Sequence, residues 1–286
     1  MRKAKDIFRR IRKILAGIIW LLLVMIIMQK SVLPPALQVD RIRSNTRSIE
    51  FDYVSWTLDA LLIKVEQLSL DPSLYMNEDR QVQLVKEYVY LIQEINSTEV
   101  EIRRVYADPE ITEPEQAASD LLAKQKQLQA DNRRFAPLVE SIIQNQISTV
   151  LADQDLSLVG QPIPPLLYHV SSLPMALIVS PRTTIRQDAD ISLLPDLTLD
   201  QITDLEQSVE SSEDVSALVV PVGGIGIYPT MVMQTADLPW LLEVVSHEWV
   251  HNFLTLRPLG VNYGTTPELR TMNETTASIG GTEISQ

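Results

Sequence analysis

Hydrophobic residues follow three different patterns along the chain. They first form one unbroken run, Ile14–Met28, and then recur at three- and four-residue spacing as far as about residue 155. Beyond residue 160 the apolar runs are short and rich in β-branched residues, with glycine and proline between them. The patterns predict an α+β protein with an apolar N-terminal helix, a helical region and a C-terminal region that contains a small sheet.

The middle region, residues 36–155, is expected to be helical throughout, because it contains no glycine and its apolar residues keep a helical period. Charged positions along it are expected to face solvent. The region should form a helical stalk or bundle. The spacing of apolar and proline residues predicts its helices over residues 53–68, 78–106, 115–131 and 137–151.

The C-terminal region, residues 160–286, is expected to be a separate α+β unit. A helix should begin after Thr198 as N-cap, with Gln201 completing a capping box. The sequence Val222-Gly223-Gly224 between two apolar runs predicts a hairpin. The β-rich runs predict strands over residues 166–170, 175–180, 217–222 and 225–232.

Residues 14–33 have the composition of a transmembrane anchor. At about 1.5 Å per residue, the run approaches a hydrocarbon core of roughly 30 Å. A cleaved signal peptide is the alternative, although no small-residue cleavage site follows the run. Residues 1–13 carry seven basic side chains and one acidic side chain, which places them in the cytoplasm by the positive-inside rule. These features predict a single-pass protein of the plasma membrane, with the remaining domains extracytoplasmic.

Composition and charge exclude several classes of site. The formal net charge is −13 although the first segment is basic, so the rest of the chain is strongly acidic. An acidic surface repels phosphate backbones, and nucleic acid is therefore not an expected partner. The chain contains no cysteine, which excludes disulfides, thiolate metal ligands and thiol catalysis.

The sequence from His247 to His251, HEWVH, matches the H-E-x-x-H pattern. It lies in a helical pattern that begins near Asp237 as N-cap. On a helix, a spacing of four places both imidazoles on one face, where they can bind one tetrahedral metal ion. Glu248 lies beside them as the candidate general base for a metal-activated water. A core helix with two incidental histidines is the alternative.

A candidate third ligand, Glu274, follows 23 positions after His251 within the stretch NETTAS. The two stretches together resemble the gluzincin metallopeptidases, the clan of the thermolysin-like enzymes and related aminopeptidases. The resemblance covers about residues 215–286. It implies a zincin-like domain with an active-site helix, in which His247, His251 and Glu274 bind zinc and Glu248 is the general base.

The chain departs from that clan in two respects. Thermolysin-like enzymes place an acid four residues after the glutamate ligand to orient a histidine, whereas Ser278 stands there in this chain. Those enzymes also carry a downstream Tyr or His that stabilises the oxyanion, and residues 275–286 contain neither. Either the oxyanion donor lies upstream, with Tyr228 and Tyr263 as candidates, or the domain is C-terminally incomplete.

The segment before the H-E-x-x-H helix contains a candidate substrate-binding edge. Gly224, Ile225 and Gly226 are expected in a strand to which the backbone of a peptide can pair. The remaining histidine, His169, lies in an apolar run and is expected in the core rather than as a ligand. The predicted partners are therefore a peptide or protein substrate and the membrane.

Three classes of function are compatible with these residues. The first is a membrane-anchored zinc-dependent peptidase, and the second is a degenerate zincin that binds a metal or a partner without catalysis. The third is a structural membrane-tethered protein whose helical stalk, a coiled coil, is the functional part. Zinc content separates the third class from the other two, and turnover of an unfolded protein substrate separates the first from the second.

Overall fold

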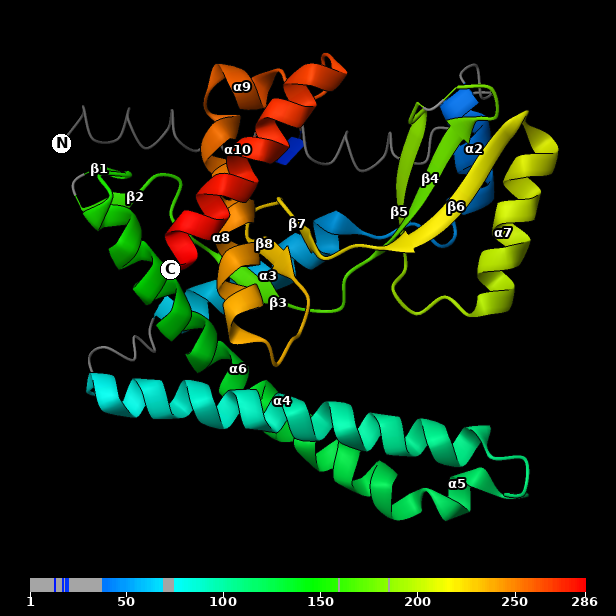
Figure 1. The fold of residues 1–286 in the computed structure, drawn as a ribbon, viewed down its shortest axis with the longest axis horizontal. Helices are drawn as coiled ribbons and strands as arrows, with labels where there is room; N and C mark the ends of the chain where they lie inside the picture. Colours follow the sequence, from blue (N-terminus) through cyan, green and yellow to red (C-terminus); the bar gives the residue numbers. More distant parts are fainter. Residues whose placement is uncertain are drawn as a thin grey trace. The chain divides into compact units, whose positions relative to one another are not determined.

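The computed structural model describes residues 13, 17, 19, 20, 38–68, 75–158, 160–184 and 186–286. The chain divides into two compact units, Met1–Arg47 and Ser48–Gln286. In the first unit, helix α2 spans Gln38–Thr46. The elements from α3 to α10 belong to the second unit, which contains all of the candidate chemistry (Figure 1).

The second unit begins with helices and continues with short strands and further helices. Its helical part consists of α3 at Tyr53–Leu68, α4 at Glu78–Ala107, α5 at Pro114–Ala117 and α6 at Ser119–Asp153. The next elements are β1 at Ser157–Leu158, β2 at Gln161–Pro162, β3 at Tyr168–Val170, β4 at Met175–Pro181, β5 at Ala189–Leu193, α7 at Leu199–Ser212 and β6 at Val215–Pro221. The chain then forms β7 at Gly224–Ile225, β8 at Thr230–Val232, α8 at Leu238–Thr255, α9 at Pro258–Val261 and α10 at Pro267–Ser285.

The predicted positions of α3 and α4 are confirmed, but the two helices expected over residues 115–131 and 137–151 are one helix, α6. Pro137 lies inside α6. A proline there removes one backbone hydrogen bond and costs about 3 kcal/mol. The residues that follow it are buried in the hydrophobic core, and this burial offsets the lost bond. The prediction of a break at Pro137 was wrong because it considered only the local effect of proline.

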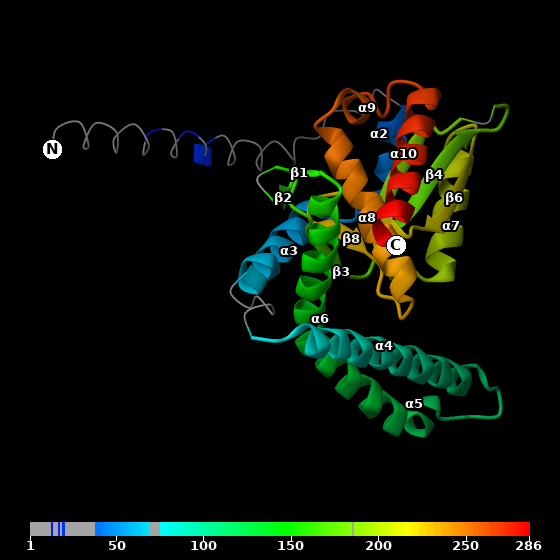
Figure 2. The same cartoon turned by 60° about the vertical axis from the view of Figure 1, so that its left-hand side comes forward.

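The strands form two three-stranded sheets and one two-stranded sheet. In the first three-stranded sheet the order is β5-β4-β6, and both neighbours of β4 are antiparallel to it. Buried residues alternate with more exposed ones along β5 and β6, so one face of the sheet is covered. Helix α7 packs along β6 (Figures 1 and 2), and its predicted capping box at Thr198 and Gln201 is present.

Both edges of the β5-β4-β6 sheet are occupied by other parts of the chain. Beside β5, the backbone N–H of Phe51 donates to the carbonyl of Ser192. Beside β6, the N–H groups of Ala217 and Val219 donate to the side chains of Glu210 and Glu206 on α7, at 3.1 and 2.8 Å. Blocked edges of this kind do not pair with a further strand.

The second three-stranded sheet has the order β3-β8-β7, with β3 parallel and β7 antiparallel to β8. The hairpin predicted at 222–224 is therefore wrong, since β6 and β7 belong to different sheets. The hairpin lies instead between β7 and β8, and it splits the strand predicted over 225–232. Residues 222–224 connect one sheet to the other.

The helical region and the region after residue 160 share one hydrophobic core. Buried residues of α4 and α6 lie in the same cluster as buried residues of β3, β8, α8 and α10. Ile92, Ile143 and Leu151 come from the helical region, while Tyr168 and Trp249 come from the later elements. The change of sequence pattern near residue 160 therefore does not separate two cores.

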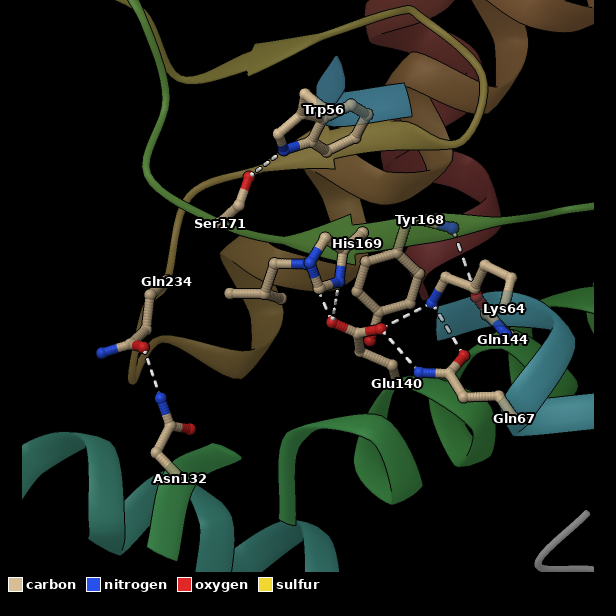
Figure 3. Close-up of polar contacts among 11 residues, drawn as sticks. Trp56, Lys64, Gln67, Asn132, Glu140, Gln144, Tyr168, His169, Ser171 and Gln234 are labelled. Atoms are coloured by element: carbon tan, nitrogen blue, oxygen red, sulfur yellow. Dashed lines mark hydrogen bonds and ion pairs between the residues drawn. The ribbon is translucent and has the colours of Figure 1, made fainter. Parts of the chain in front are cut away.

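A buried ion pair joins α3, α6 and β3 beside this core (Figure 3). Lys64 Nζ lies 2.5 Å from Glu140 Oε2, and both side chains are 3% exposed. The Glu140 carboxylate also accepts hydrogen bonds from Gln67 Nε2 and from the N–H of Val170, and it lies 3.0 Å from His169 Nδ1. Burial alone would raise the pKa of Glu140, but the charge of Lys64 and the contact with His169 outweigh it and lower that pKa to about 2. Glu140 is therefore an ionised, buried carboxylate that accepts several hydrogen bonds. A buried charge is tolerated only when it is paired and hydrogen-bonded in this way.

The expected transmembrane anchor, and with it the single-pass plasma-membrane location, needs correction. Among the residues that the structure describes, no helix is long and apolar enough to cross a membrane. A span requires about 20 consecutive, mainly apolar residues, and the described helices do not provide such a segment. Of the range 14–33 in which the anchor was predicted, all but Gly17, Ile19 and Trp20 lies outside the described residues.

Removing the cation of the buried pair tests how strongly it holds α3 to α6. Lys64→Met leaves the Glu140 carboxylate buried without its counter-charge, so we expect the free energy of unfolding to fall by about 3 kcal/mol. Arg80→Met is the control, because the Arg80–Glu87 pair is 47% and 44% exposed and such pairs contribute about 0–1 kcal/mol. Urea denaturation of both purified variants measures the losses. Equal losses for the two variants would contradict the stabilising role.

Candidate metal centre

Helix α8 carries the H-E-x-x-H motif and begins where the sequence predicts. Its N-cap, Asp237, accepts a hydrogen bond from the N–H of Trp240 at 3.1 Å. Farther along, the Trp249 side chain is buried, and its Nε1 donates to the carbonyl of Pro164 at 2.8 Å. One side of α8 is thereby fixed in the core, and the motif residues on the other side line a cavity.

The structure brings the side chains of His247, His251 and Glu274 together. The Nε2 atoms of the two histidines are 3.0 Å apart. Glu274, on α10, places Oε2 at 3.7 Å from His247 Nε2 and at 3.4 Å from His251 Nε2. Among the described residues, these three side chains are the group of metal-ligating type whose atoms all lie within 4.8 Å of one another.

The size of this triangle fits a zinc ion. Ligand atoms bound at about 2.1 Å in tetrahedral geometry lie about 3.4 Å from one another. The three sides of the triangle, 3.0, 3.4 and 3.7 Å, are close to that separation. Two imidazoles and one carboxylate are also a donor set found in catalytic zinc sites, where a fourth position stays open. The residues therefore fit zinc in both geometry and chemistry.

Asn273 determines which nitrogen of His251 faces the other ligands. Its Nδ2 donates to the carbonyl of Leu259 at 3.3 Å, so its Oδ1 is the atom that lies 2.7 Å from His251 Nδ1. Nδ1 of His251 must then carry the proton that forms this bond. Nε2 is left with its lone pair directed at the group, which is the tautomer that a metal requires.

Sequence reasoning did not find this role of Asn273. In thermolysin-like enzymes the orienting acid stands four residues after the glutamate ligand, and the residue there, Ser278, is exposed in this chain. Asn273 directly precedes Glu274 on α10 and is buried against α8. The only signal was its place in the stretch NETTAS, because a partner across two helices cannot be recognised from local spacing.

The surroundings of His247 also favour the neutral imidazole. Burial lowers its pKa, and the neighbouring His251 lowers it further, while the carboxylates of Glu274 and Glu243 have a weaker opposite effect. Neutral imidazole is the form that coordinates a metal. His169 takes no part in this group, since its ring contacts Glu140 in the buried network.

Glu248 is 8% exposed and lies beside the triangle on the wall of the cavity. The chain at β7 can pass directly against its carboxylate because Gly224 in the strand and Gly226, which directly follows the strand and was expected in it, have no side chain. A Cβ on Gly224 would lie 2.9 Å from Glu248 Oε1, and one on Gly226 would lie 3.0 Å from Oε2. Burial and the charge of Glu274 raise the pKa of Glu248 to about 7.

The two tyrosines considered as oxyanion donors lie in different places. Tyr263 lines the cavity, and its hydroxyl donates to Glu274 Oε1 at 2.5 Å. Burial and this contact with Glu274 raise the pKa of Tyr263 to about 12, so its hydroxyl stays protonated. Tyr228 instead donates to the carbonyl of Pro165 and is not among the residues that line the cavity. The structure therefore brings Tyr263, and not Tyr228, to the group.

The cavity beside the triangle has a volume of about 690 Å³. Gly224, Ile225 and Gly226, the predicted substrate edge, line it together with the metal-ligating side chains. Strand β7 is the outer strand of the β3-β8-β7 sheet. An unpaired strand edge beside a cavity can accept the backbone of an extended peptide.

Close packing of α10 against α8 holds Glu274 at the histidines. Gly281 of α10 lies so near α8 that a Cβ there would be 2.9 Å from the Cβ and 3.0 Å from the backbone N of His247. Gly280 lies equally close to Val250, and Ala277 between them and Glu274 is fully buried. Small residues thus line the face of α10 that packs against α8.

Gly281→Ala should displace α10 and weaken zinc binding. The added methyl meets backbone atoms of α8, which cannot move aside as a flexible side chain can. We expect zinc affinity to fall about tenfold or more, even though alanine favours a helix over glycine by about 1 kcal/mol. Gly264→Ala is the control, since nothing lies within 4 Å of its added Cβ. Competition with a zinc-binding dye measures both, and an unchanged affinity in Gly281→Ala would refute the packing argument.

Comparison of the chain with protein-family models, with curated proteins and with solved structures finds no match. The resemblance to gluzincins thus depends on the stretches HEWVH and NETTAS in the sequence. The structure adds the mutual distances of His247, His251 and Glu274, and the position of Glu248 beside them.

Proposed function

We propose that this protein is a zinc-dependent peptidase that hydrolyses peptide bonds with Glu248 as general base. The observation that carries the proposal is the meeting of His247, His251 and Glu274 at zinc-ligand separations beside the buried Glu248. A cavity large enough for part of a peptide opens on the same four residues. When bound there, zinc would act as a Lewis acid that polarises the scissile carbonyl and makes water nucleophilic at neutral pH.

The residues of the chain supply binding and proton transfer. Strand β7 holds the substrate backbone in extended form beside Glu248. As the oxygen of water bonds to the carbonyl carbon, Glu248 takes the released proton on its carboxylate. It then gives this proton to the leaving nitrogen as the C–N bond breaks. Tyr263 holds Glu274 in place through the hydrogen bond from its hydroxyl.

A metal-binding module without catalysis is the second candidate, and one observation favours it. The Tyr263 hydroxyl is engaged with Glu274 Oε1, and the hydroxyl of Tyr53, which also lines the cavity, donates to Ser192 Oγ. A peptidase needs a donor for the oxyanion, and removal of one such donor typically costs about a hundredfold in rate or more. Turnover of an unfolded protein substrate decides between the two candidates.

Ligand and base variants should fail in different ways. Glu248→Gln should keep zinc but lose activity by about a hundredfold or more, because a general base contributes on this scale. His247→Ala, His251→Ala and Glu274→Ala should lose the zinc itself, and activity with it. Metal analysis of the purified protein and turnover of a casein-like substrate measure the two properties.

Glu243→Gln is the matched control, because Glu243 lies on the same helix but is exposed and does not line the cavity. It should keep both zinc and activity. A parent protein that binds no zinc would refute the proposal. A parent protein that binds zinc but never cleaves peptides would establish the second candidate.

A further inference from the structure

Part of the wall of the cavity comes from the β5-β4-β6 sheet, which carries none of the three metal-ligating side chains. Apart from Met175 at the start of β4, the cavity-lining residues of these strands occupy alternate positions, so they share one face of the sheet. The strand register places Ala176 between Ser192 and Val220, and Ile178 beside Asp190. The wall is therefore apolar along β4 and β6 and polar along β5.

Asp190 is an acidic group on this wall without a cationic partner among the described residues. Its Oδ2 accepts a hydrogen bond from the side-chain amide of Gln187 at 2.9 Å. Arg270 reaches the oxygen of the same amide at 2.8 Å, so its guanidinium contacts Gln187 and not the carboxylate. No lysine or arginine is among the cavity-lining residues that the structure describes, whereas Asp190, Glu248 and Glu274 all line it. The cavity therefore has an acidic character.

The arrangement of the wall suits a long side chain that ends in a cation. Lysine and arginine combine an aliphatic stem with a charged head, and the stem packs well on apolar surface. Ala176, Ile178 and Val220 provide that surface. The carboxylate of Asp190 lies at its far side, where a charge-assisted hydrogen bond can form with the head group.

The distance across the sheet favours a side chain over a terminal amino group. Strand β6 leads through residues 222–224 to β7, which lines the cavity beside the metal-ligating side chains. Strand β5 is two strands away from β6 in its sheet. Two strand spacings amount to about 10 Å. Asp190 lies on the outer strand that is away from this connection, so a long lysine or arginine side chain suits it better than an α-ammonium, which stays about one residue, roughly 4 Å, from the bond to be cleaved.

We propose that Asp190 is a specificity-determining residue that selects peptides with a lysine or arginine side chain a few residues from the bond to be cleaved. The cleavage in this statement rests on the proposed peptidase function. The preference for a basic peptide rests only on the cavity wall and is measurable without turnover.

Binding to the Glu248→Gln protein loaded with zinc tests the inference. The probes are two dye-labelled peptides with blocked termini, one with lysine at alternate positions and one with glutamine in its place. We expect the lysine peptide to bind about tenfold tighter, a difference of about 1.4 kcal/mol, and the difference to shrink as salt is added. Fluorescence anisotropy gives both dissociation constants.

Variants of the same protein show whether Asp190 causes the preference. Asp190→Asn should remove it, and Asp190→Lys should transfer it to a peptide with glutamate in place of lysine. Asp188→Asn is the control, because Asp188 pairs with Arg186 and does not line the cavity. A preference that survives in Asp190→Asn would overturn the assignment, and the reversal by Asp190→Lys shows that the wall remains folded.

Two further outcomes keep this inference separate from the proposed function. Equal binding of the lysine and glutamine peptides overturns the role of Asp190, whether or not the protein cleaves peptides. An Asp190-dependent preference without any cleavage by the parent protein supports Asp190 and refutes the peptidase. A neutral peptide with a free α-amino group is the third probe, and Asp190-dependent binding of that probe would show that the wall selects chain termini instead.

Discussion

Gly281 lets α10 pack against the backbone of α8 at His247, because no side chain separates the two helices there. Glu274 stands seven residues earlier on α10, on nearly the same face. Its carboxylate can therefore reach both histidines only while this close packing persists. The same approach buries Asn273 against His251 and fixes the tautomer of that ring. Ligand position and ligand protonation both depend on one helix–helix contact.

Polar contacts as well as apolar packing hold the elements around the α8–α10 contact in place. Trp249 joins α8 to the segment before β3 through its hydrogen bond to Pro164. Lys64 and Glu140 join α3 to α6, and Glu140 also receives the backbone N–H of Val170 on β3. A buried ion pair adds little net stability, since both charges leave water. It does oppose other arrangements of these elements, which would leave a buried charge without its partner.

The sheets leave one strand edge beside the metal group. Backbone near Phe51 covers the edge of β5, and Glu206 and Glu210 occupy the edge amides of β6. Strand β7 lines the cavity, and Gly224 within it and Gly226 directly after it allow the backbone to contact the Glu248 carboxylate. The same geometry that makes β7 suitable for a peptide backbone also buries Glu248 and raises its pKa.

Local sequence determined the features that depend on neighbouring residues. Helical period and capping residues placed α3, α4, α7 and α8. The spacing of four in the H-E-x-x-H motif placed two imidazoles on one face of a helix, since this follows from helix geometry alone. Glu248 and Glu274 could be recognised as candidate site residues from their motifs, HEWVH and NETTAS. Their positions in space could not be predicted from these motifs.

Only the tertiary structure decided the features that depend on distant residues. Helix α6 continues through Pro137 because burial in the shared core outweighs a local cost. Asn273 meets His251, and Asp190 lines the same cavity as the metal-ligating side chains, because elements far apart in the chain enclose one cavity. These contacts have no local signal, since their energies arise from packing, burial and charge that exist only once the chain has folded.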